Sequence, residues 1–269
     1  MSGQRSGLAA DSPGTGGTAS LTPAAATGRI FLLDLARSLA VLAMIGFHFG
    51  VDLELFGLAP PGMTRQGGWW WAARLIAGSF LFLAGVSLWL AHRKGLRWRA
   101  FLRRLAMVGA GAAAVSLGTY LAMPQVFVHF GILHSIALSS VIGLAFLRLN
   151  WVLVALASAA VFWLGNNWSS PAFAAPYLWW TGLAPAGAVR PSMDFEPIFP
   201  WLAAFLAGLA TSKLLDSAGI WAWLSAPASG QNQSLQGLGW PGRHSLAIYL
   251  IHQPLLFAGF LGLRQIGVI

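Results

Sequence analysis

Residues 28–57 have the sequence GRIFLLDLARSLAVLAMIGFHFGVDLELFG, and this stretch determines the fold class of the chain. It is long and apolar enough to cross a bilayer as a helix, which takes about 20 predominantly apolar residues. A helix turns about 100° per residue, so four of its ionisable side chains share one face. They are Asp34, Arg37, His48 and Asp52. The stretch therefore predicts a membrane helix with an ionisable stripe, in which His48 lies about 16 Å along the axis from Arg37.

The composition of the whole chain extends this membrane assignment. Of its 269 residues, 57% are hydrophobic and 9% are charged, and the mean hydropathy is +0.68. Soluble domains carry about 25% charged residues, so the composition argues strongly against a soluble globular enzyme. The 14 Trp residues suit the two interfaces of a membrane. Because Cys is absent, disulfides, thiolate metal sites and Cys nucleophiles are excluded.

Apolar segments along the chain predict an all-α, polytopic transmembrane bundle of about seven spans, give or take one. They are 30–51, 69–91, 101–121, 127–147, 151–165, 197–213 and 244–263. The fifth and sixth are short for a span, and the patch 219–226 is too short to cross and suits the membrane surface. Residues 1–28 are small, polar and rich in Gly and Pro, which predicts a disordered tail before a transmembrane domain over 29–264.

The basic residues predict the orientation, because cytoplasmic loops are enriched in Lys and Arg. A cluster of them lies at the corner between the second and third segments: Arg93, Lys94, Arg97 and Arg99 in the loop, and Arg103 and Arg104 just beyond it. This corner is predicted to be cytoplasmic, with the N-terminus also inside and the C-terminus outside. The net charge of +9 then reflects topology and gives no indication of nucleic acid binding. A second role is binding of a phosphorylated cytosolic donor, with Arg93, Arg97, Arg103 and Arg104 as candidate ligands.

The ionisable stripe of the first segment also points to chemistry. A charge at the centre of a membrane helix costs about 2.5–3.5 kcal/mol, so such residues are usually paired or functional. Asp34 and Arg37, three residues apart, can neutralise each other as a structural ion pair. Asp52 follows His48 by four residues, a spacing at which a carboxylate can orient an imidazole and raise its basicity. That arrangement is typical of acyl-transfer sites, and a hydrogen-bonded interfacial His48 is the alternative.

The order of these residues resembles a known family. Arg29, Asp34, Arg37 and His48 have the spacing with which type-3 integral-membrane acyltransferases begin. The string LDLARSLAVLAMIGFHFGVDLELFG is similar to bacterial proteins that resemble the catalytic domain of heparan-alpha-glucosaminide N-acetyltransferase. Three further segments fit in the same order: RLIAGSFLFLAGVSLWL (74–90), HFGILHSIALSS (129–140) and GRHSLAIYLIHQPLL (242–256). In two departures, Ser38 stands where a Gly commonly follows the Arg, and the chain is shorter than type-3 enzymes usually are.

The resemblance implies an acetyltransferase of the bacterial inner membrane. Its co-substrate would be acetyl-CoA from the cytoplasmic side, and no metal is expected. The acceptor would be a hydroxyl or amine of a carbohydrate or cell-envelope molecule, with His48 as general base or acyl carrier. The oligomeric state stays open, a dimer included.

Candidate substrate-binding residues are the other polar side chains within apolar segments. They are Arg74, His134, Tyr249, His252 and Gln253. The last three share one face of the final segment, directly before a Pro of the kind found in helices that line a cavity. Arg74 is expected to snorkel outward, to pair with Asp52 or Glu54, or to stabilise an oxyanion. For His134, the alternative is a buried and fully hydrogen-bonded structural residue.

Two other functions remain open at this point. Intramembrane His, Asp and Arg residues also build proton relays, so a proton-coupled transporter is one of them. Against it, no inverted repeat is evident, and about seven spans is small for such a machine. The other is a non-catalytic membrane scaffold. Aromatic residues in the loop 166–196 suit a sugar ring and a membrane interface equally, so they do not decide among these functions.

Overall fold

The computed structural model describes residues 30–224 and 237–269, which form helices joined by loops. The predicted tail 1–28 and Arg29 lie outside the described residues. Within the described ranges, extended pairing is limited to one isolated β-bridge between Phe130 and Phe195. The prediction of an all-α fold is therefore confirmed.

Each of the predicted apolar segments forms a helix. These helices are α1 (Phe31–Leu55), α2 (Gly67–His92), α3 (Trp98–Ala122), α4 (Ile132–Gly143), α5 (Trp151–Asn167), α6 (Ile198–Ser217) and α10 (Ser245–Gln265). By length and composition α1, α2, α3, α6 and α10 can cross a membrane, and α4 and α5 are shorter apolar helices. The chain is thus a polytopic, all-helical membrane protein.

Short helical turns connect these elements. They are η1 (Met63–Arg65), η2 (Leu144–Phe146), η3 (Pro171–Phe173), η4 (Pro176–Thr181), α7 (Ile220–Leu224) and α9 (Trp240–Arg243). The apolar patch 219–226 contains α7, which is far too short to span a bilayer, as the sequence predicts.

The fourth segment becomes helical at Ile132, five residues later than predicted. The chain before Ile132 pairs with the loop that precedes α6, where Met193 N donates to Val126 O (2.9 Å). Asp194 of that loop accepts a hydrogen bond from Ile132 N (3.1 Å) and so satisfies one of the free amides at the start of α4. The loop before α6 is therefore tied to the start of α4.

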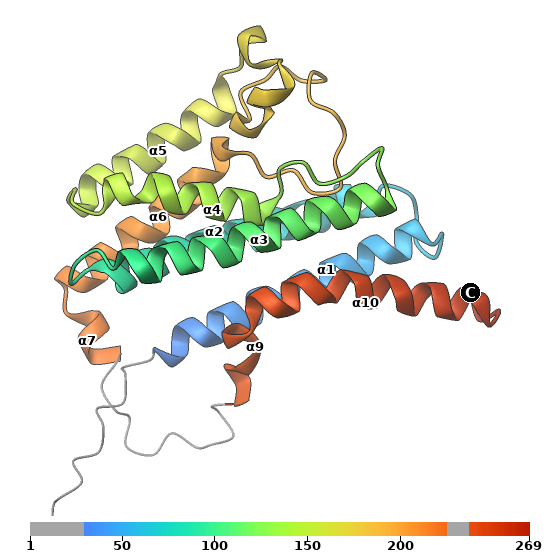
Figure 1. The fold of residues 1–269 in the computed structure, drawn as a ribbon, viewed down its shortest axis with the longest axis horizontal. Helices are drawn as coiled ribbons and strands as arrows, with labels where there is room; N and C mark the ends of the chain where they lie inside the picture. The colour runs from blue at the N-terminus through green and yellow to red at the C-terminus, as the bar shows by residue number, and fades with distance from the viewer. Residues whose placement is uncertain (1–29, 225–236) are drawn as a thin grey trace, which may run out of the picture.

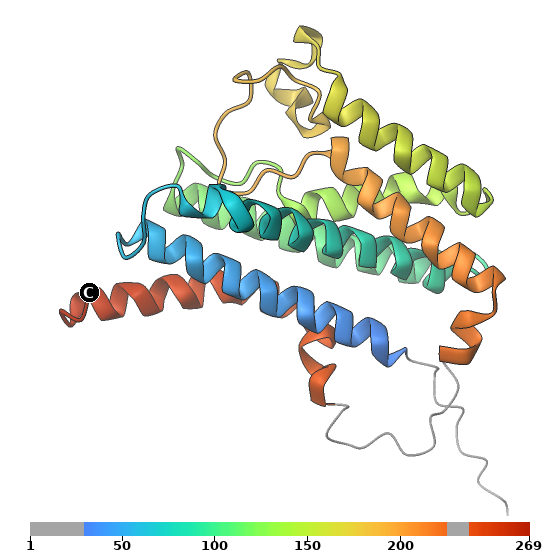
Figure 2. The same ribbon diagram turned by 180° about the vertical axis from the view of Figure 1, so that it is seen from behind.

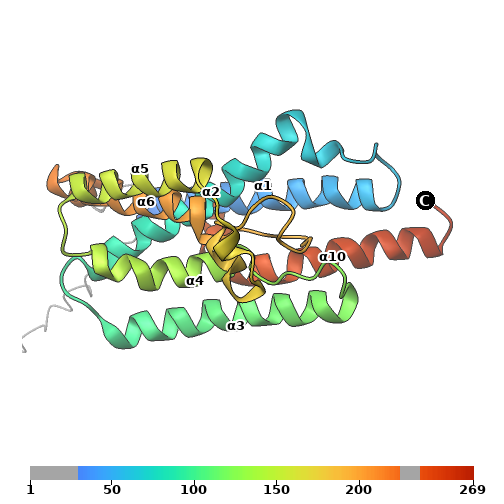
Figure 3. The ribbon, with the colours of Figure 1, turned by 90° about the horizontal axis from the view of Figure 1, so that it is seen from above.

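The helices lie side by side, with α1 and α10 at one edge and α5 at the opposite edge (Figure 1). Helix α6 packs between α5 and α2, and α1 packs against both α2 and α10. The view from behind shows the start of α1 and the end of α6 toward the same end of the bundle (Figure 2). Seen from above, α3 and α4 run next to each other (Figure 3). The α2–α3 corner and the start of α10 lie toward the same end as the start of α1.

Helices α2 and α6 pack with their backbones in close contact. A side chain at Gly85 would overlap the carbonyl oxygen of Phe205, and one at Gly208 would overlap that of Phe82. Small residues let membrane helices approach until their backbones touch, which replaces hydrophobic attraction with close packing. Phe205 is completely buried in the core that forms around this contact.

Lys213 is a buried cation that holds the loop between η2 and α5 against α6. Its Nζ donates to the carbonyl oxygens of Leu147 (2.9 Å) and Leu149 and lies 4.4 Å from the centre of the Trp89 ring. Lys213→Met would leave two carbonyl oxygens without their donor, which should lower the free energy of unfolding by about 2 kcal/mol. The thermal unfolding midpoint in detergent should therefore fall by about 6 °C. Leu214→Met, at the adjacent exposed position, is the matched control. Equal midpoints for the two variants would contradict this role of Lys213.

Candidate active site

Two cavities enter the bundle at opposite ends. The inner cavity, about 510 Å³, is formed by the start of α1, the end of α2, and the starts of α3 and α10. The outer cavity, about 630 Å³, is formed by the end of α1, the start of α2 and the loop before α6. "Inner" here denotes the end that carries the basic α2–α3 corner. Phe80, Ile132 and Tyr249 line both cavities, so the two cavities border each other at these side chains.

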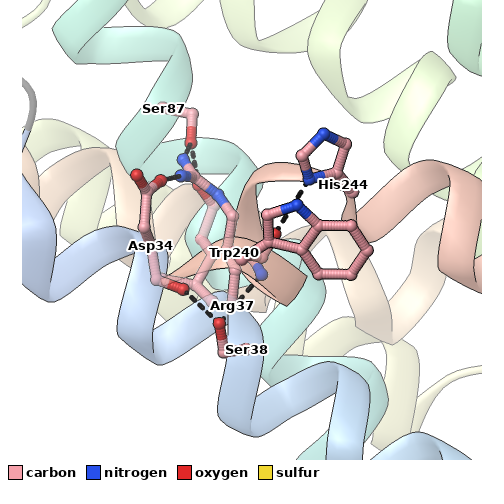
Figure 4. Close-up of polar contacts among 8 residues, drawn as sticks. Asp34, Arg37, Ser38, Ser87, Trp240 and His244 are labelled. Carbon is pink, nitrogen blue, oxygen red and sulfur yellow. Dashed lines mark hydrogen bonds and ion pairs between the residues drawn. The ribbon is translucent and has the colours of Figure 1, made fainter. Parts of the chain in front are cut away.

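Arg37 lies in the wall of the inner cavity and connects α1 to α2 (Figure 4). Its Nη1 donates to Asp34 Oδ1 (2.9 Å), and its Nη2 donates to Ser87 Oγ (2.7 Å). The Asp34–Arg37 ion pair that the spacing predicts is therefore formed. Because Ser87 belongs to α2, the guanidinium is fixed from two helices.

Ser38 fastens α9 to α1 beside this ion pair. Its hydroxyl donates to Asp34 O (3.0 Å) and accepts from Gly242 N (2.8 Å). A side chain at residue 242 would overlap the Asp34 carbonyl oxygen, so the approach requires a glycine. Trp240 and His244 of the same segment lie next to this contact (Figure 4). The hydroxyl of Ser38, where a Gly was expected, thus has a structural function.

Three Arg residues from three parts of the chain line the inner cavity. They are Arg37 of α1, Arg104 of α3 and Arg243 of α9. Guanidinium groups bind phosphate through paired hydrogen bonds, so this end of the protein suits a phosphorylated ligand. Arg243 was not among the predicted ligands of the donor. Its approach to Arg37 depends on the α9–α1 contact, which the sequence does not reveal.

The other predicted ligands of a phosphorylated donor lie elsewhere. Arg93 forms an ion pair with Asp216 at the end of α6 and is thus partly neutralised. Arg97 and Arg103 are exposed, and neither lines the inner cavity. Of the four predicted residues, the structure brings only Arg104 to the cavity, because α3 turns one side of its first two turns toward the bundle.

His48 lines the outer cavity from α1. Its Nδ1 lies 3.1 Å from the carbonyl oxygen of Met44, which can only accept, so the proton is assigned to Nδ1. The other ring nitrogen, Nε2, then carries the lone pair of a base or nucleophile. The ring of His252 from α10 lies edge-on to His48, with 4.8 Å between the ring centres.

Asp52 does not pair with His48 as predicted. Its Oδ1 accepts a hydrogen bond from Gln253 Nε2 (2.8 Å), and the residue is completely buried between α1 and α10. The prediction was wrong because α10 brings a donor of its own to the carboxylate. In the described part of the chain, Asp52 Oδ2, His252 Nε2 and Gln253 Oε1 are buried without a hydrogen bond. The contact between α1 and α10 thus contains polar atoms close to His48 that can still form hydrogen bonds.

Arg74 borders the outer cavity and contacts an aromatic ring. Its guanidinium carbon lies 3.4 Å from the centre of the Trp70 ring, and its charge acts on Glu196 across the cavity. The predicted partner Glu54 instead accepts hydrogen bonds from Thr64 N (3.0 Å) and Thr64 Oγ1 (2.7 Å). Pairing of Arg74 with Glu54 is therefore not formed, and a role toward an oxyanion stays a prediction.

Asp194 and Glu196 line the outer cavity, although the sequence did not single them out as ligands. Tyr249 of α10 forms a side-chain hydrogen bond with Asp194. Burial raises the pKa of Asp194 to about 6. Burial, and then the neighbouring Asp194, raise the pKa of Glu196 well above its usual value. The sequence feature that could have identified this part of the site is the position of Asp194 and Glu196, two acidic residues directly before an apolar helix.

The raised pKa of Asp194 predicts a pH dependence of stability. The native carboxyl holds its proton up to about pH 6, whereas the unfolded one releases it near 3.8. The stabilisation from this group is therefore full below pH 3.8 and is lost as the pH rises through 6. Asp194→Asn cannot titrate and retains an acceptor for Ile132 N. Relative to wild type, its unfolding midpoint should rise by a few degrees between pH 4 and pH 7. A pH-independent difference would refute this.

His134 is removed from both cavities and is held by hydrogen bonds at the α3–α4 junction. Its Nδ1 accepts from Gly131 N (3.2 Å), so its Nε2 carries the proton and donates to Ser116 Oγ (3.3 Å). Ser116 passes its own proton on to Val128 O (2.6 Å). Because both ring nitrogens are used, the structure supports the alternative of a structural His134 over substrate binding.

Within residues 30–224 and 237–269, no group of three His, Cys, Asp or Glu side chains is placed to hold a metal ion. The ionisable groups that line the two cavities include His48, the carboxyls of Asp34, Asp194 and Glu196, and the Arg residues. A free imidazole nitrogen facing a cavity suits proton abstraction or nucleophilic attack.

Comparison with known proteins identifies a family. The model of the family described as heparan-alpha-glucosaminide N-acetyltransferase, catalytic, matches residues 29–254. No curated protein and no solved structure shows a significant match. The matched range contains both cavities and the whole α1–α10 seam up to Pro254.

Proposed function

Because this chain belongs to the heparan-alpha-glucosaminide N-acetyltransferase catalytic-domain family, we propose that it moves an acetyl group across the membrane from cytosolic acetyl-CoA to an acceptor outside. The observation that carries the proposal is the pair of cavities that share Phe80, Ile132 and Tyr249. One cavity is rich in Arg residues, and the other holds His48.

The inner cavity suits the donor. Arg37, Arg104 and Arg243 would bind the phosphates of coenzyme A, since paired guanidinium hydrogen bonds favour phosphate oxygens. The apolar wall at Phe80 and Ile132 would accept the acyl end of the molecule. The thioester of acetyl-CoA is itself activated for transfer, so the residues of the inner cavity would only have to hold its acetyl group in position.

His48 would carry out the proton or acyl transfer. As a general base, its Nε2 takes a proton from the acceptor hydroxyl or amine, whose oxygen or nitrogen then bonds to the acetyl carbon as the thiolate leaves. As an acyl carrier, its Nε2 holds the acetyl group as acetyl-imidazole before the acceptor takes it. Both routes require the lone pair that the Nδ1–Met44 hydrogen bond leaves on Nε2.

The outer cavity would bind the acceptor, a sugar-like or cell-envelope molecule with a free hydroxyl or amine. Asp194, Glu196 and Tyr249 offer polar groups to it, and Arg74 offers a positive charge to an oxyanion. His252 and Gln253 would support His48 and Asp52 from α10. Asp34 would act on the donor side, by holding Arg37.

The orientation follows from charge. The basic α2–α3 corner supports a cytosolic inner end, and with it a cytosolic N-terminus. In a bacterium, the corresponding location is the inner membrane. An acyl-CoA is made in the cytosol, so this orientation would give the inner cavity direct access to it.

The test is transfer across a sealed bilayer. Purified protein is reconstituted into vesicles, radiolabelled acetyl-CoA is added on one side, and glucosamine or a hydroxylated sugar is enclosed on the other. We expect labelled acetyl sugar only in vesicles that contain the protein. Protein-dependent escape of the enclosed sugar without acetyl-CoA would favour a transporter, and absence of both acetyl-CoA binding and transfer would refute the proposal.

A further inference from the structure

The proposed reaction needs a proton at a different place from where it releases one. Transfer of an acetyl group from coenzyme A to a hydroxyl breaks a C–S bond, forms a C–O bond and removes one proton from the acceptor. The leaving thiolate takes up one proton, because free thiols have a pKa of about 8.5 and are protonated at neutral pH. Under the function proposed above, the acceptor lies in the outer cavity and the thiolate leaves into the inner one. The proton is therefore released on one side of the cavity boundary and needed on the other.

Tyr249 is placed to connect the two sides of this boundary. Three residues line both cavities, and two of them, Phe80 and Ile132, carry no exchangeable side-chain proton. Within residues 30–224 and 237–269, Tyr249 is thus the one side chain at the shared boundary that can give and take a proton. His48, in contrast, lines the outer cavity and not the inner one.

The contacts of Tyr249 hold its hydroxyl in position and supply a proton partner. The residue packs against the hydrophobic core, and its carbonyl oxygen lies 2.7 Å from Nδ1 of His252. Its hydroxyl forms a hydrogen bond with the carboxyl of Asp194, which lines the outer cavity together with His48. The pKa of Asp194 is raised to about 6 by burial, so near neutral pH this carboxyl can both accept and release a proton. A hydrogen-bonded path thus leads from the outer cavity to the boundary.

We propose that Tyr249 is a catalytic residue that protonates the leaving thiolate and thereby moves the proton of the acceptor from the outer to the inner cavity. As the C–S bond breaks, the Tyr249 hydroxyl gives its proton to the sulfur. The phenolate regains a proton from Asp194, which collects the proton that the acceptor loses, by way of His48 in the general-base route. The products are the acetylated acceptor and the free thiol, and every residue returns to its starting state.

The proposal rests on the function proposed above and adds a transmembrane proton transfer to it. The relay is independent of the choice between general base and acyl carrier, because the thiolate leaves into the inner cavity in both routes. Its consequence is that acetyl transfer to a hydroxyl changes the proton content of neither compartment.

The experiment counts protons during transfer across a sealed bilayer. The full-length protein is reconstituted into weakly buffered vesicles that enclose a hydroxylated sugar and a pH-sensitive dye. Radiolabelled acetyl-CoA is added outside, and valinomycin with potassium removes any membrane potential. Wild type should form acetyl sugar without acidifying the lumen, because the proton of each hydroxyl leaves with coenzyme A. Without the relay, each acetyl group transferred would release one proton into the lumen.

Tyr249→Phe removes the hydroxyl and keeps the ring. Its kcat should fall about a hundredfold, within the range for loss of a positioned proton donor, whereas the KM for acetyl-CoA should stay unchanged. The residual transfer should release one proton into the lumen per acetyl group. Tyr120→Phe is the matched control, since this Tyr is 52% exposed and lines neither cavity. It should retain the kcat and the proton count of wild type.

Release of one lumenal proton per acetyl group by wild type would overturn the relay, even if Tyr249→Phe failed to fold. So would a Tyr249→Phe variant with the kcat of wild type. Both results leave the acetyltransferase function standing, because they are measured on acetyl sugar that has formed. Absence of transfer by wild type would instead refute the proposed function, and the relay with it.

Discussion

His48→Ala is expected to lower kcat for acetyl transfer about a thousandfold at saturating acetyl-CoA, because a positioned base contributes about 10²–10⁴ in rate. His48 is the one imidazole of the described chain whose ring lines the outer cavity and whose Nδ1 is bonded to its own helix. Removing it leaves the donor site at the other end of the bundle intact. The affinity for acetyl-CoA should therefore change less than threefold.

Two measurements separate this role from a loss of structure. His244→Ala is the matched control, because this exposed His bonds to Trp240 O and lines neither of the two cavities. It should retain wild-type kcat. Added imidazole should restore part of the activity of His48→Ala, since it can enter the space left at the cavity wall. Transfer by His48→Ala at the wild-type rate would refute the mechanism.

A trapping experiment on wild-type protein distinguishes the two routes. Rapid quenching with denaturant at neutral pH, where an acetyl-imidazole survives, should trap a labelled acetyl group on wild-type protein if His48 is an acyl carrier, and none if it is a general base. His252→Ala should lower kcat by less than His48→Ala, because the ring of His252 contacts that of His48 and its Nδ1 is bonded to Tyr249 O (2.7 Å).

The fold was largely predictable because hydropathy acts segment by segment. Each apolar segment became a helix, and the largest boundary error was at the start of the fourth, where the helix begins five residues later than predicted. Residues 127–131 are apolar enough for a helix, yet they pair with the loop before α6, from which Asp194 caps Ile132. That loop lies more than sixty positions further along the chain, so no local pattern reveals the pairing.

The site was predictable only where a single helix defines it. The shared face of Arg37 and His48 follows from helical periodicity, and so does the ion pair of Arg37 with Asp34. The partner of Asp52 comes from α10 and is 201 positions away, so the spacing to His48 was misleading. For His134 the deciding contacts come from α3 and the turn before α4.

At the basic α2–α3 corner, too, the sequence could not predict contacts with distant parts of the chain. Six basic residues at one corner indicate a cytosolic side, but the sequence does not reveal which of them face the bundle. Arg93 is drawn to Asp216, 123 positions away, because α2 packs along α6. Arg103 and Arg104 are neighbours in sequence and lie on different sides of α3, since successive residues differ by about 100° around a helix.

Arg104→Gln should therefore raise the KM for acetyl-CoA about thirtyfold, whereas Arg103→Gln should leave it unchanged. Loss of a charged hydrogen bond to phosphate costs about 2 kcal/mol, which corresponds to this factor. The kcat of Arg104→Gln should change less than threefold, because Arg104 lies in the inner cavity and His48 in the outer one. Both variants remove one positive charge from the same turn, so a general electrostatic effect would raise KM equally in both. An equal rise of KM in both variants would exclude the inner cavity as the donor site. A rise of KM in Arg104→Gln alone would support it.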